Sequence, residues 1–181
     1  IEFIFKRNTF SRDNMSKTTQ ENLAIAFAGE SQANRKYLAF AAQAEKEGFP
    51  VIAKLFRATA EAETVHALGH FRNMGGVGTT VENLQAAFGG ESYEFNEMYP
   101  PMVEQAEKEK HKALQMLRFA EKAERVHAEL YTKALEAAKE HKDLEDMDIW
   151  YCPVCGFVEY AKEGVERCPI CGAPRSKFVK A

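Results

Sequence analysis

The sequence has no long hydrophobic run and no strong excess of one charge. No stretch of about 18 consecutive apolar residues occurs, so we expect no helix that crosses a membrane. The net charge of −3 gives no electrostatic footprint for a nucleic acid. With 45% hydrophobic residues among 181, the chain can still bury a core. We therefore expect one ordinary domain with a small satellite, and neither a membrane protein nor a nucleic-acid-binding protein.

Cysteine is absent before residue 152, and the four cysteines form two C-x-x-C pairs, Cys152 with Cys155 and Cys168 with Cys171. The first residues, IEFIFKRNTFSRDN, contain too short an apolar run for a secretory signal. Without such a signal disulfides are disfavoured, and paired knuckles indicate metal ligands in a reducing cytoplasm. We interpret residues 1–15 as an extra or disordered segment that precedes the fold.

Capping signals and apolar periodicity predict four helices. Thr18 and Glu21 form a capping box that begins a helix reaching about Glu47, and GFP at 48–50 ends it. Further helices are expected over about 51–74, 81–109 and 111–142, the third bent by the pairs Gly89-Gly90 and Pro100-Pro101. An acidic linker follows over 143–148, and then short strands and turns over 149–181.

Glutamates occur on helix faces that the apolar periodicity assigns to the core. Glu30 lies seven residues after Leu23 and four after Ala26, so it shares their face. The other helices repeat this anomaly at Glu63, Glu91, Glu94 and Glu124. Unpaired carboxylates are costly to bury, and five that face one another would also repel. Bound divalent or trivalent cations would offset both effects.

Two E-x-x-H motifs, Glu63 with His66 and Glu124 with His127, strengthen this interpretation. Residues three apart project from one side of a helix, so a carboxylate and an imidazole can bind one metal. A single motif of this kind would be weak evidence, because it is common on solvated helices. Two motifs together with Glu30 and Glu91 from the remaining helices match the di-iron pattern of ferritin-like bundles. The oxygen-rich set favours iron or manganese over zinc.

An internal repeat relates the two halves of the helical region. AFAGES at 26–31 recurs as AFGGES at 87–92, and the same offset relates Glu30 to Glu91. Glu63 and His66 correspond in this way to Glu124 and His127. The repeat predicts two equivalent hairpins about an approximate two-fold axis through the metal pair. One position breaks the symmetry, because the counterpart of Glu94 is Ala33.

The knuckles CPVCG and CPICG predict a tetrathiolate metal site. The knuckles alone leave iron and zinc equally open. Iron is favoured by the fusion to a di-iron bundle, where a one-electron Fe(Cys)4 site has a purpose and a zinc site does not. A small aromatic core is expected from Trp150, Tyr151, Phe157, Tyr160 and Phe178.

The sequence resembles the rubrerythrin family. The resemblance covers residues 16–181 and rests on AFAGESQANRKY, EAETVH, GGESYEFNEMYP, AEKAERVH and both knuckles, in the family's order. It implies an all-α, ferritin-like four-helix bundle over 16–142 and a small β/loop, rubredoxin-like Fe(Cys)4 domain over 149–181. The implied di-iron ligands are Glu30, Glu63, His66, Glu91, Glu94, Glu124 and His127, and the implied ligands of a mononuclear iron are Cys152, Cys155, Cys168 and Cys171.

The same resemblance implies a peroxidase that reduces hydrogen peroxide to water. Its electrons would come from NAD(P)H through a separate redox protein, such as a rubredoxin or an NAD(P)H-dependent reductase. The family pattern also implies that one iron is held by His66 when reduced and by Glu94 when oxidised. Tyr37 and Tyr99 would either hydrogen-bond to ligand carboxylates or simply pack in the core.

Three further expectations complete the interpretation. The family resemblance implies a head-to-tail homodimer, which would bring the cysteine module of one copy close to the di-iron site of the other. The main alternative function is a ferroxidase or iron-storage protein of the ferritin type. A third possibility is a scaffold with structural zinc in both sites.

Overall fold

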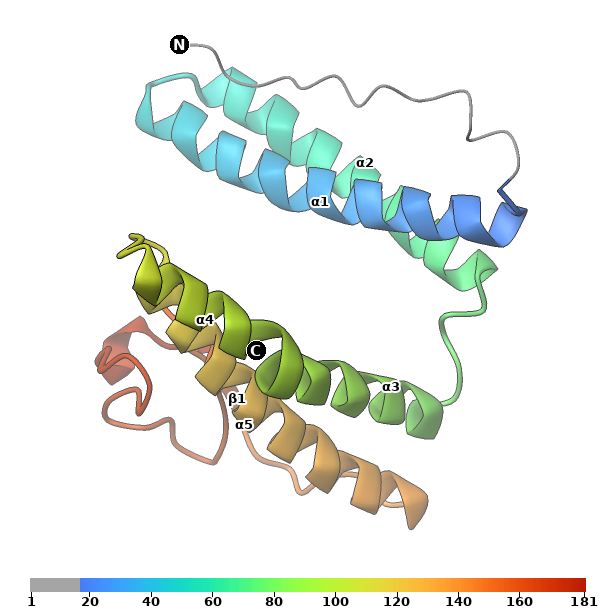
Figure 1. Ribbon diagram of the computed structural model, residues 1–181, viewed down its shortest axis with the longest axis vertical. Helices are drawn as coiled ribbons and strands as arrows, with labels where there is room; N and C mark the ends of the chain where they lie inside the picture. Colours follow the sequence, from blue (N-terminus) through green and yellow to red (C-terminus); the bar gives the residue numbers. More distant parts are fainter. Residues whose placement is uncertain (1–16) are drawn as a thin grey trace. The chain divides into compact units, whose positions relative to one another are not determined.

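The computed structural model describes residues 17–181, so the interpretation of residues 1–15 concerns a part of the chain outside this range. The chain divides into two compact units, which meet in sequence between Val77 and Gly78 (Figure 1). None of the helices described is long and apolar enough to cross a bilayer.

The first unit is a helical hairpin made of α1 (Thr19–Lys46) and α2 (Pro50–Asn73). The Thr18 hydroxyl accepts a hydrogen bond from the Glu21 amide, and the Glu21 carboxylate accepts one from the Thr18 amide, which confirms the predicted capping box. Gly48 has a φ of +83°, a conformation that favours glycine and ends α1. Pro50 then begins α2, where the missing N–H costs nothing.

The seam between α1 and α2 is built from small side chains. The buried residues of the hairpin are Asn34, Ala41, Ala44, Ala53, Ala60 and Ala67. Asn34 is the polar member: its amide donates to the Ala60 carbonyl at 2.7 Å and to the Thr64 hydroxyl at 2.8 Å. Alanines allow the helix backbones to approach closely, so the larger apolar side chains remain on the outer surfaces of the hairpin.

The second unit contains α3 (Thr80–Tyr93), the π-helical segment η2 (Glu94–Met98), α4 (Tyr99–Lys108) and α5 (Leu114–Lys139). The predicted third helix is therefore interrupted between the two residue pairs expected to bend it. Gly89 and Gly90 lie inside α3, before the interruption. Pro100 and Pro101 lie in the first turn of α4 and cannot donate hydrogen bonds to the preceding turn. The Tyr99 amide bonds instead to the Glu94 carbonyl, five residues back.

The π-helical segment inserts one residue into the second repeat. The sequence QAEKE occurs at 43–47 and again at 105–109, an offset one residue longer than that between Glu30 and Glu91. The two segments also make the same side-chain hydrogen bond. The Gln43 amide donates to the Glu47 carboxylate and the Gln105 amide to the Glu109 carboxylate, both at 2.6 Å. Tyr37 and Tyr99 differ by this longer offset and are therefore equivalent positions.

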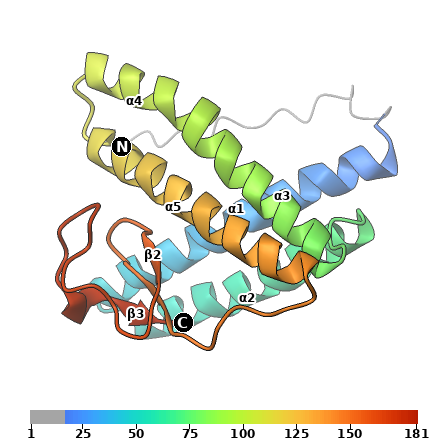
Figure 2. The ribbon, with the colours of Figure 1, turned by 90° about the horizontal axis from the view of Figure 1, so that it is seen from below.

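The cysteine module follows α5 as a three-stranded antiparallel sheet in the order β2-β1-β3, made of β1 (Ile149–Tyr151), β2 (Val158–Tyr160) and β3 (Val179–Lys180), with a short 3₁₀ turn η3 (Arg175–Lys177). Phe157 and Phe178 are buried with the cysteines, their rings edge-to-face at 6.2 Å. Phe119 and Val126 of α5 pack against this cluster, and the module lies alongside α5 in Figure 2.

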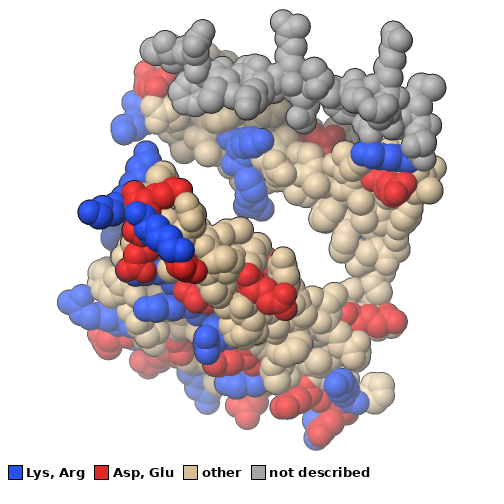
Figure 3. All heavy atoms as spheres, in the orientation of Figure 1, with Lys and Arg blue, Asp and Glu red and all other residues tan. Residues whose placement is uncertain are grey.

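Acidic and basic side chains are mixed over the second unit on the face drawn in Figure 3. Ion pairs such as Lys108 with Glu104 and Arg118 with Glu107 contribute to this mixture. The local pattern therefore agrees with the small net charge of the whole sequence.

Candidate metal centres

Four thiols converge in the cysteine module. The Sγ atoms of Cys152 and Cys171 are 3.6 Å apart, those of Cys155 and Cys168 are 3.4 Å apart, and all four lie within 4.8 Å of one another. Sulfurs at about 2.3 Å from a tetrahedral metal would be about 3.8 Å apart. No disulfide joins these cysteines. The donor set and its spacing therefore fit a tetrathiolate metal ion.

The knuckle backbone shapes the thiol site electrostatically. Gly156 and Gly172 adopt positive φ angles of 84° and 75°, which turn each knuckle tightly around its sulfurs. Burial raises the pKa of the Cys155 thiol strongly. Burial also acts to raise the pKa of Cys168, but hydrogen bonds from the backbone N–H groups of Cys171 and Ile170, together with those from the Cys155 and Cys171 thiols, lower that pKa overall. Donors that favour a thiolate are what a metal-bound sulfur requires.

The first unit carries three of the predicted di-iron ligands together. Ligand atoms of Glu30, Glu63 and His66 lie within 4.8 Å of one another, and His66 Nδ1 is 3.0 Å from Glu63 Oε2. The Glu63 side chain is only 14% exposed, whereas His66 is 56% exposed. The three-residue spacing predicted from the sequence thus places a carboxylate and an imidazole side by side on α2.

The second unit repeats this arrangement with Glu91, Glu124 and His127. His127 Nδ1 lies 2.7 Å from Glu124 Oε2 and 3.4 Å from Glu91 Oε2. All three side chains are at most 21% exposed, so their charges are poorly hydrated. Burial raises the pKa of Glu124 to about 7, and a hydrogen bond to Glu91 adds to the rise. This crowding of carboxylates is relieved when a cation replaces the shared proton.

Glu94 and Tyr99 border the second cluster at the two ends of the π-helical segment. Burial and the charge of Glu91 raise the pKa of Glu94, while His127 opposes the rise. Burial raises the pKa of Tyr99, and the charges of Glu124, Glu94 and Glu91 contribute further. Tyr99 therefore lies within electrostatic reach of three carboxylates. The equivalent Tyr37 packs among aromatic rings, 6.3 Å from those of Phe40 and Phe56.

A hydrogen bond joins the second cluster to the cysteine module. His127 Nε2 lies 2.9 Å from the carbonyl oxygen of Gly156, the residue that follows Cys155. A carbonyl only accepts, so Nε2 carries the proton in this contact and Nδ1 is free to bind a metal. The sequence interpretation missed Gly156 as a functional residue, because a backbone carbonyl leaves no signal in side-chain spacing.

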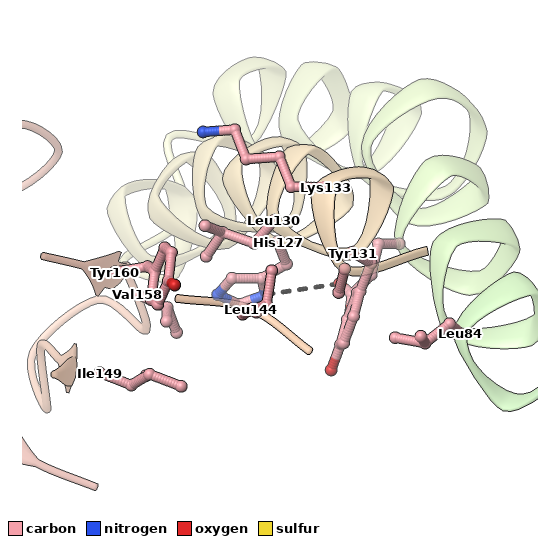
Figure 4. A pocket seen from close by; sticks show the side chains of 11 residues that line it. Leu84, His127, Leu130, Tyr131, Lys133, Leu144, Ile149, Val158 and Tyr160 are labelled. Atoms are coloured by element: carbon pink, nitrogen blue, oxygen red, sulfur yellow. Dashed lines mark ion pairs between the residues drawn. The ribbon is translucent and has the colours of Figure 1, made fainter. Parts of the chain in front are cut away.

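A mostly apolar pocket of about 440 Å³ lies beside this contact (Figure 4). Its walls come from α3, α5, the linker and the first two strands, and they include Leu84, Leu130, Leu144, Ile149 and Val158. Glu91 and His127 are among its few polar lining groups. The pocket is thus large enough for small molecules and adjoins two predicted metal ligands.

Comparison with known proteins identifies the family. The profile described as Rubrerythrin matches residues 21–135, and the profile described as Rubrerythrin, rubredoxin-like domain, matches residues 150–179. The chain belongs to the rubrerythrin family. It has a mostly helical, ferritin-like di-iron domain with carboxylate and histidine groups, followed by a rubredoxin-like four-cysteine site, as the sequence predicted.

Individual relatives of this rubrerythrin-family chain agree. It is 38% identical to Rubrerythrin-2 of Clostridium acetobutylicum over 88% of this chain and 95% of the relative. It is 39% identical to nigerythrin of Nitratidesulfovibrio vulgaris, over 89% of this chain and 85% of the relative. The solved structure of fully reduced, all-ferrous nigerythrin matches with a TM-score of 0.54 and 34% identity, covering 91% of this chain and 87% of that one.

Proposed function

We propose that this rubrerythrin-family protein is a non-haem di-iron peroxidase that reduces hydrogen peroxide to water in defence against oxidative stress. Electrons would enter at the rubredoxin-like site and pass to the di-iron site. The proposal rests chiefly on the hydrogen bond between His127 Nε2 and the Gly156 carbonyl. Because Gly156 follows Cys155, a short covalent and hydrogen-bonded connection joins a thiol ligand to an imidazole ligand. An iron-storage protein has no need of such a connection.

The proposed di-iron ligands combine the two clusters with one additional carboxylate. They are Glu30, Glu63, His66, Glu91, Glu94, Glu124 and His127. Reduced iron held by these residues would supply two electrons together to an O–O bond, so that peroxide, two electrons and two protons would give two waters without free hydroxyl radical. Glu94 is the ligand without a counterpart in the first hairpin. We propose that it binds an iron in the oxidised state and that His66 takes its place in the reduced state, since a ferric ion favours an anionic oxygen.

The remaining residues of the second cluster would control protons and solvent. Glu124, with a pKa near 7, can hold a proton close to neutral pH in the metal-free protein. Tyr99 lies close enough to the same carboxylates for their charges to raise its pKa, and we assign its hydroxyl the role of orienting one of them. We assign Tyr37 the equivalent role in the first hairpin. The pocket beside His127 would give a small neutral molecule such as hydrogen peroxide access to the second cluster.

The wider setting of the reaction is also proposed. The electron donor would be a rubredoxin or an NAD(P)H-dependent reductase, and the setting a cytoplasm that keeps the four thiols reduced. Two copies would form a head-to-tail homodimer. We place the domain limits at 16–142 and 149–181, joined by the linker 143–148. The solved relatives named as partially reduced, mixed-valent and fully reduced nigerythrin support a redox role for the iron.

Stopped-flow mixing of the reduced, iron-loaded protein tests the proposal. We expect the protein to reoxidise far faster with hydrogen peroxide than with dioxygen. Faster reaction with dioxygen, together with mineral growth on added iron, would instead identify a ferroxidase or storage protein. Metal analysis and the visible spectrum of the same sample test the iron assignment. Zinc in both sites, without a visible band that bleaches on reduction, would contradict it.

A further inference from the structure

The end of α5 fixes the direction in which the chain enters the linker 143–148. The amides of His141 and Lys142 bond back to the carbonyls of Ala138 and Ala137, both at 3.0 Å. His141 has a φ of +57°, which turns the chain out of the helix. This combination is a Schellman motif, in which the last carbonyls of the helix are satisfied by the residues that follow it. The chain is therefore held as far as Lys142, the residue before the linker.

The second half of the linker is bonded to the cysteine module. The Tyr160 hydroxyl donates to the Glu145 carbonyl at 2.5 Å. Asp148 is held twice, because its carbonyl accepts from the Ala161 amide at 3.0 Å and its carboxylate lies 2.7 Å from the Lys180 ammonium. Tyr160 ends β2 and Lys180 ends β3, the two outer strands of the sheet. We call these bonds of Tyr160 and Asp148 the linker clamp.

The linker clamp opposes the flexibility that the composition of the linker favours. Four of its six residues are acidic, and a linker with charges of one sign extends by self-repulsion: they are Asp143, Glu145, Asp146 and Asp148. Burial raises the pKa of Tyr160, and the charges of Glu145, Asp143 and Asp146 raise it further. The Tyr160 hydroxyl thus keeps the proton that it donates to the linker.

The linker clamp also limits where the module can lie along α5. Six extended residues would reach about 20 Å, so the length of the linker alone allows many positions. With the clamp closed, Asp143 and Leu144 alone separate the Schellman motif from the residue bonded to Tyr160, and two residues reach about 7 Å. At the other side of the module, the Gly156 carbonyl lies 2.9 Å from His127 Nε2. The module is therefore held at two separate places.

We propose that Tyr160 and Asp148 are positioning residues for electron transfer, because they keep the Gly156 carbonyl against His127. The inference rests on the route of electrons in the proposed function. One hydrogen peroxide takes up two electrons, and the four-cysteine site passes one at a time. Each transfer oxidises its iron from ferrous to ferric and reduces the di-iron centre by one electron, so two transfers are needed per peroxide. Since electron tunnelling slows steeply with distance, a module released from α5 would transfer more slowly.

Amide hydrogen exchange of the full-length, iron-loaded protein tests the linker clamp independently of activity. The Met147 amide bonds to the Glu145 carbonyl at 2.9 Å, so it should exchange at least roughly tenfold more slowly than in the urea-unfolded protein. Tyr160→Phe should remove most of this protection. Tyr151→Phe is the matched control, because it deletes a hydroxyl from the adjacent strand β1 at a side chain that is 41% exposed. An unprotected linker in the unmodified protein would overturn the proposal.

Flash reduction of the four-cysteine site, in protein whose di-iron centre is oxidised, measures the transfer itself. Tyr160→Phe should slow the reoxidation of that site by roughly fivefold, the factor given by one hydrogen bond of ordinary strength. Its visible spectrum and a single oxidation of the pre-reduced protein by hydrogen peroxide should keep their unmodified values. Tyr151→Phe should transfer electrons at the unmodified rate. Transfer at the unmodified rate in Tyr160→Phe, with the protection of Met147 lost, would overturn the positioning role.

Exchange of the two charges separates positioning from damage to the fold. Asp148→Lys and Lys180→Asp should each slow electron transfer by roughly two- to fivefold, as expected for a partly exposed ion pair. The double variant should recover most of the unmodified rate, and no recovery would overturn the role of Asp148. An unmodified protein that reacts no faster with hydrogen peroxide than with dioxygen would contradict the proposed function. The exchange and flash measurements would still decide whether the linker clamp positions the module.

Discussion

At the scale of single residues, the cluster of Glu91, Glu124 and His127 crowds acidic groups together, and burial raises the pKa of Glu124 to about 7. Glu124 shares its surroundings with Glu91 and Glu94, and burial removes the water that would separate their charges. His127 has one nitrogen toward these carboxylates and the other toward a backbone carbonyl. The hydrogen bond to Gly156 therefore fixes the imidazole in the orientation and tautomer that a metal ligand needs.

The raised pKa of Glu124 predicts how the metal-free protein responds to pH. The folded state holds this proton up to about pH 7, whereas the ordinary value of 4.5 applies after unfolding. The folded state thus binds more protons between these values, and its stability must fall as the pH rises through this window. Urea unfolding of the metal-free protein should show a lower midpoint at neutral pH than near pH 5. In Glu124→Gln this loss should shrink, and an unchanged pH dependence would contradict the assignment.

Glu94→Ala makes the second hairpin resemble the first, where Ala33 occupies the equivalent position. Both iron ions should still bind, because the two three-ligand clusters remain. Steady-state peroxide turnover should nevertheless fall by at least about tenfold, since the oxidised state loses its added anionic ligand. Iron content and the turnover rate with an artificial electron donor check this expectation. Turnover equal to that of the unmodified protein would remove Glu94 from the proposed mechanism.

At the scale of elements, the repeat extends further than the six-residue match that revealed it. Thr79 and Glu82 form a capping box at the start of α3 that matches the one at Thr18 and Glu21. At the same offset, Phe95 corresponds to Asn34 and Arg125 corresponds to Thr64. In place of the hydrogen bond between Asn34 and Thr64, the Arg125 guanidinium stacks 5.0 Å from the centre of the Phe95 ring. The two hairpins thus share their caps and ligands but close their interhelical seams with different chemistry.

The π-helical segment explains why the offset changes, and it supplies a prediction about deletions. Removal of Asn96 should convert η2 into regular α-helix, because the offset between equivalent residues of the two hairpins then becomes uniform. The residues of α4 that face α5 should continue to face it. Removal of Gln85 from the regular α3 should instead rotate the residues on either side by about 100° relative to one another. Thermal unfolding followed by circular dichroism should therefore show a small loss for the first variant and a large one for the second. Equal losses would argue against an inserted residue.

At the scale of the whole molecule, the cysteine module and the helical region form a redox relay in the proposed function. Cys152 is fully buried and belongs to the thiol cluster, so Cys152→Ser should disrupt that metal site selectively. The pre-reduced protein should still be oxidised once by hydrogen peroxide. Repeated turnover with a rubredoxin or an NAD(P)H-dependent reductase as electron donor should fall to the rate measured without the protein. Single-turnover and steady-state measurements on one preparation check this. Full steady-state turnover would exclude the proposed route of electrons.

The sequence alone determined the helices, the two knuckles and the family, because each depends on local chemistry. Capping boxes, E-x-x-H spacing and C-x-x-C pairs each involve residues only a few positions apart. They can therefore be recognised from the sequence without a structure. Only the tertiary structure located the π-helical segment, the buried Asn34 and the contact of His127 with Gly156. These features depend on backbone carbonyls and on helix phase after an insertion. Neither is encoded in the spacing of side chains along a single helix.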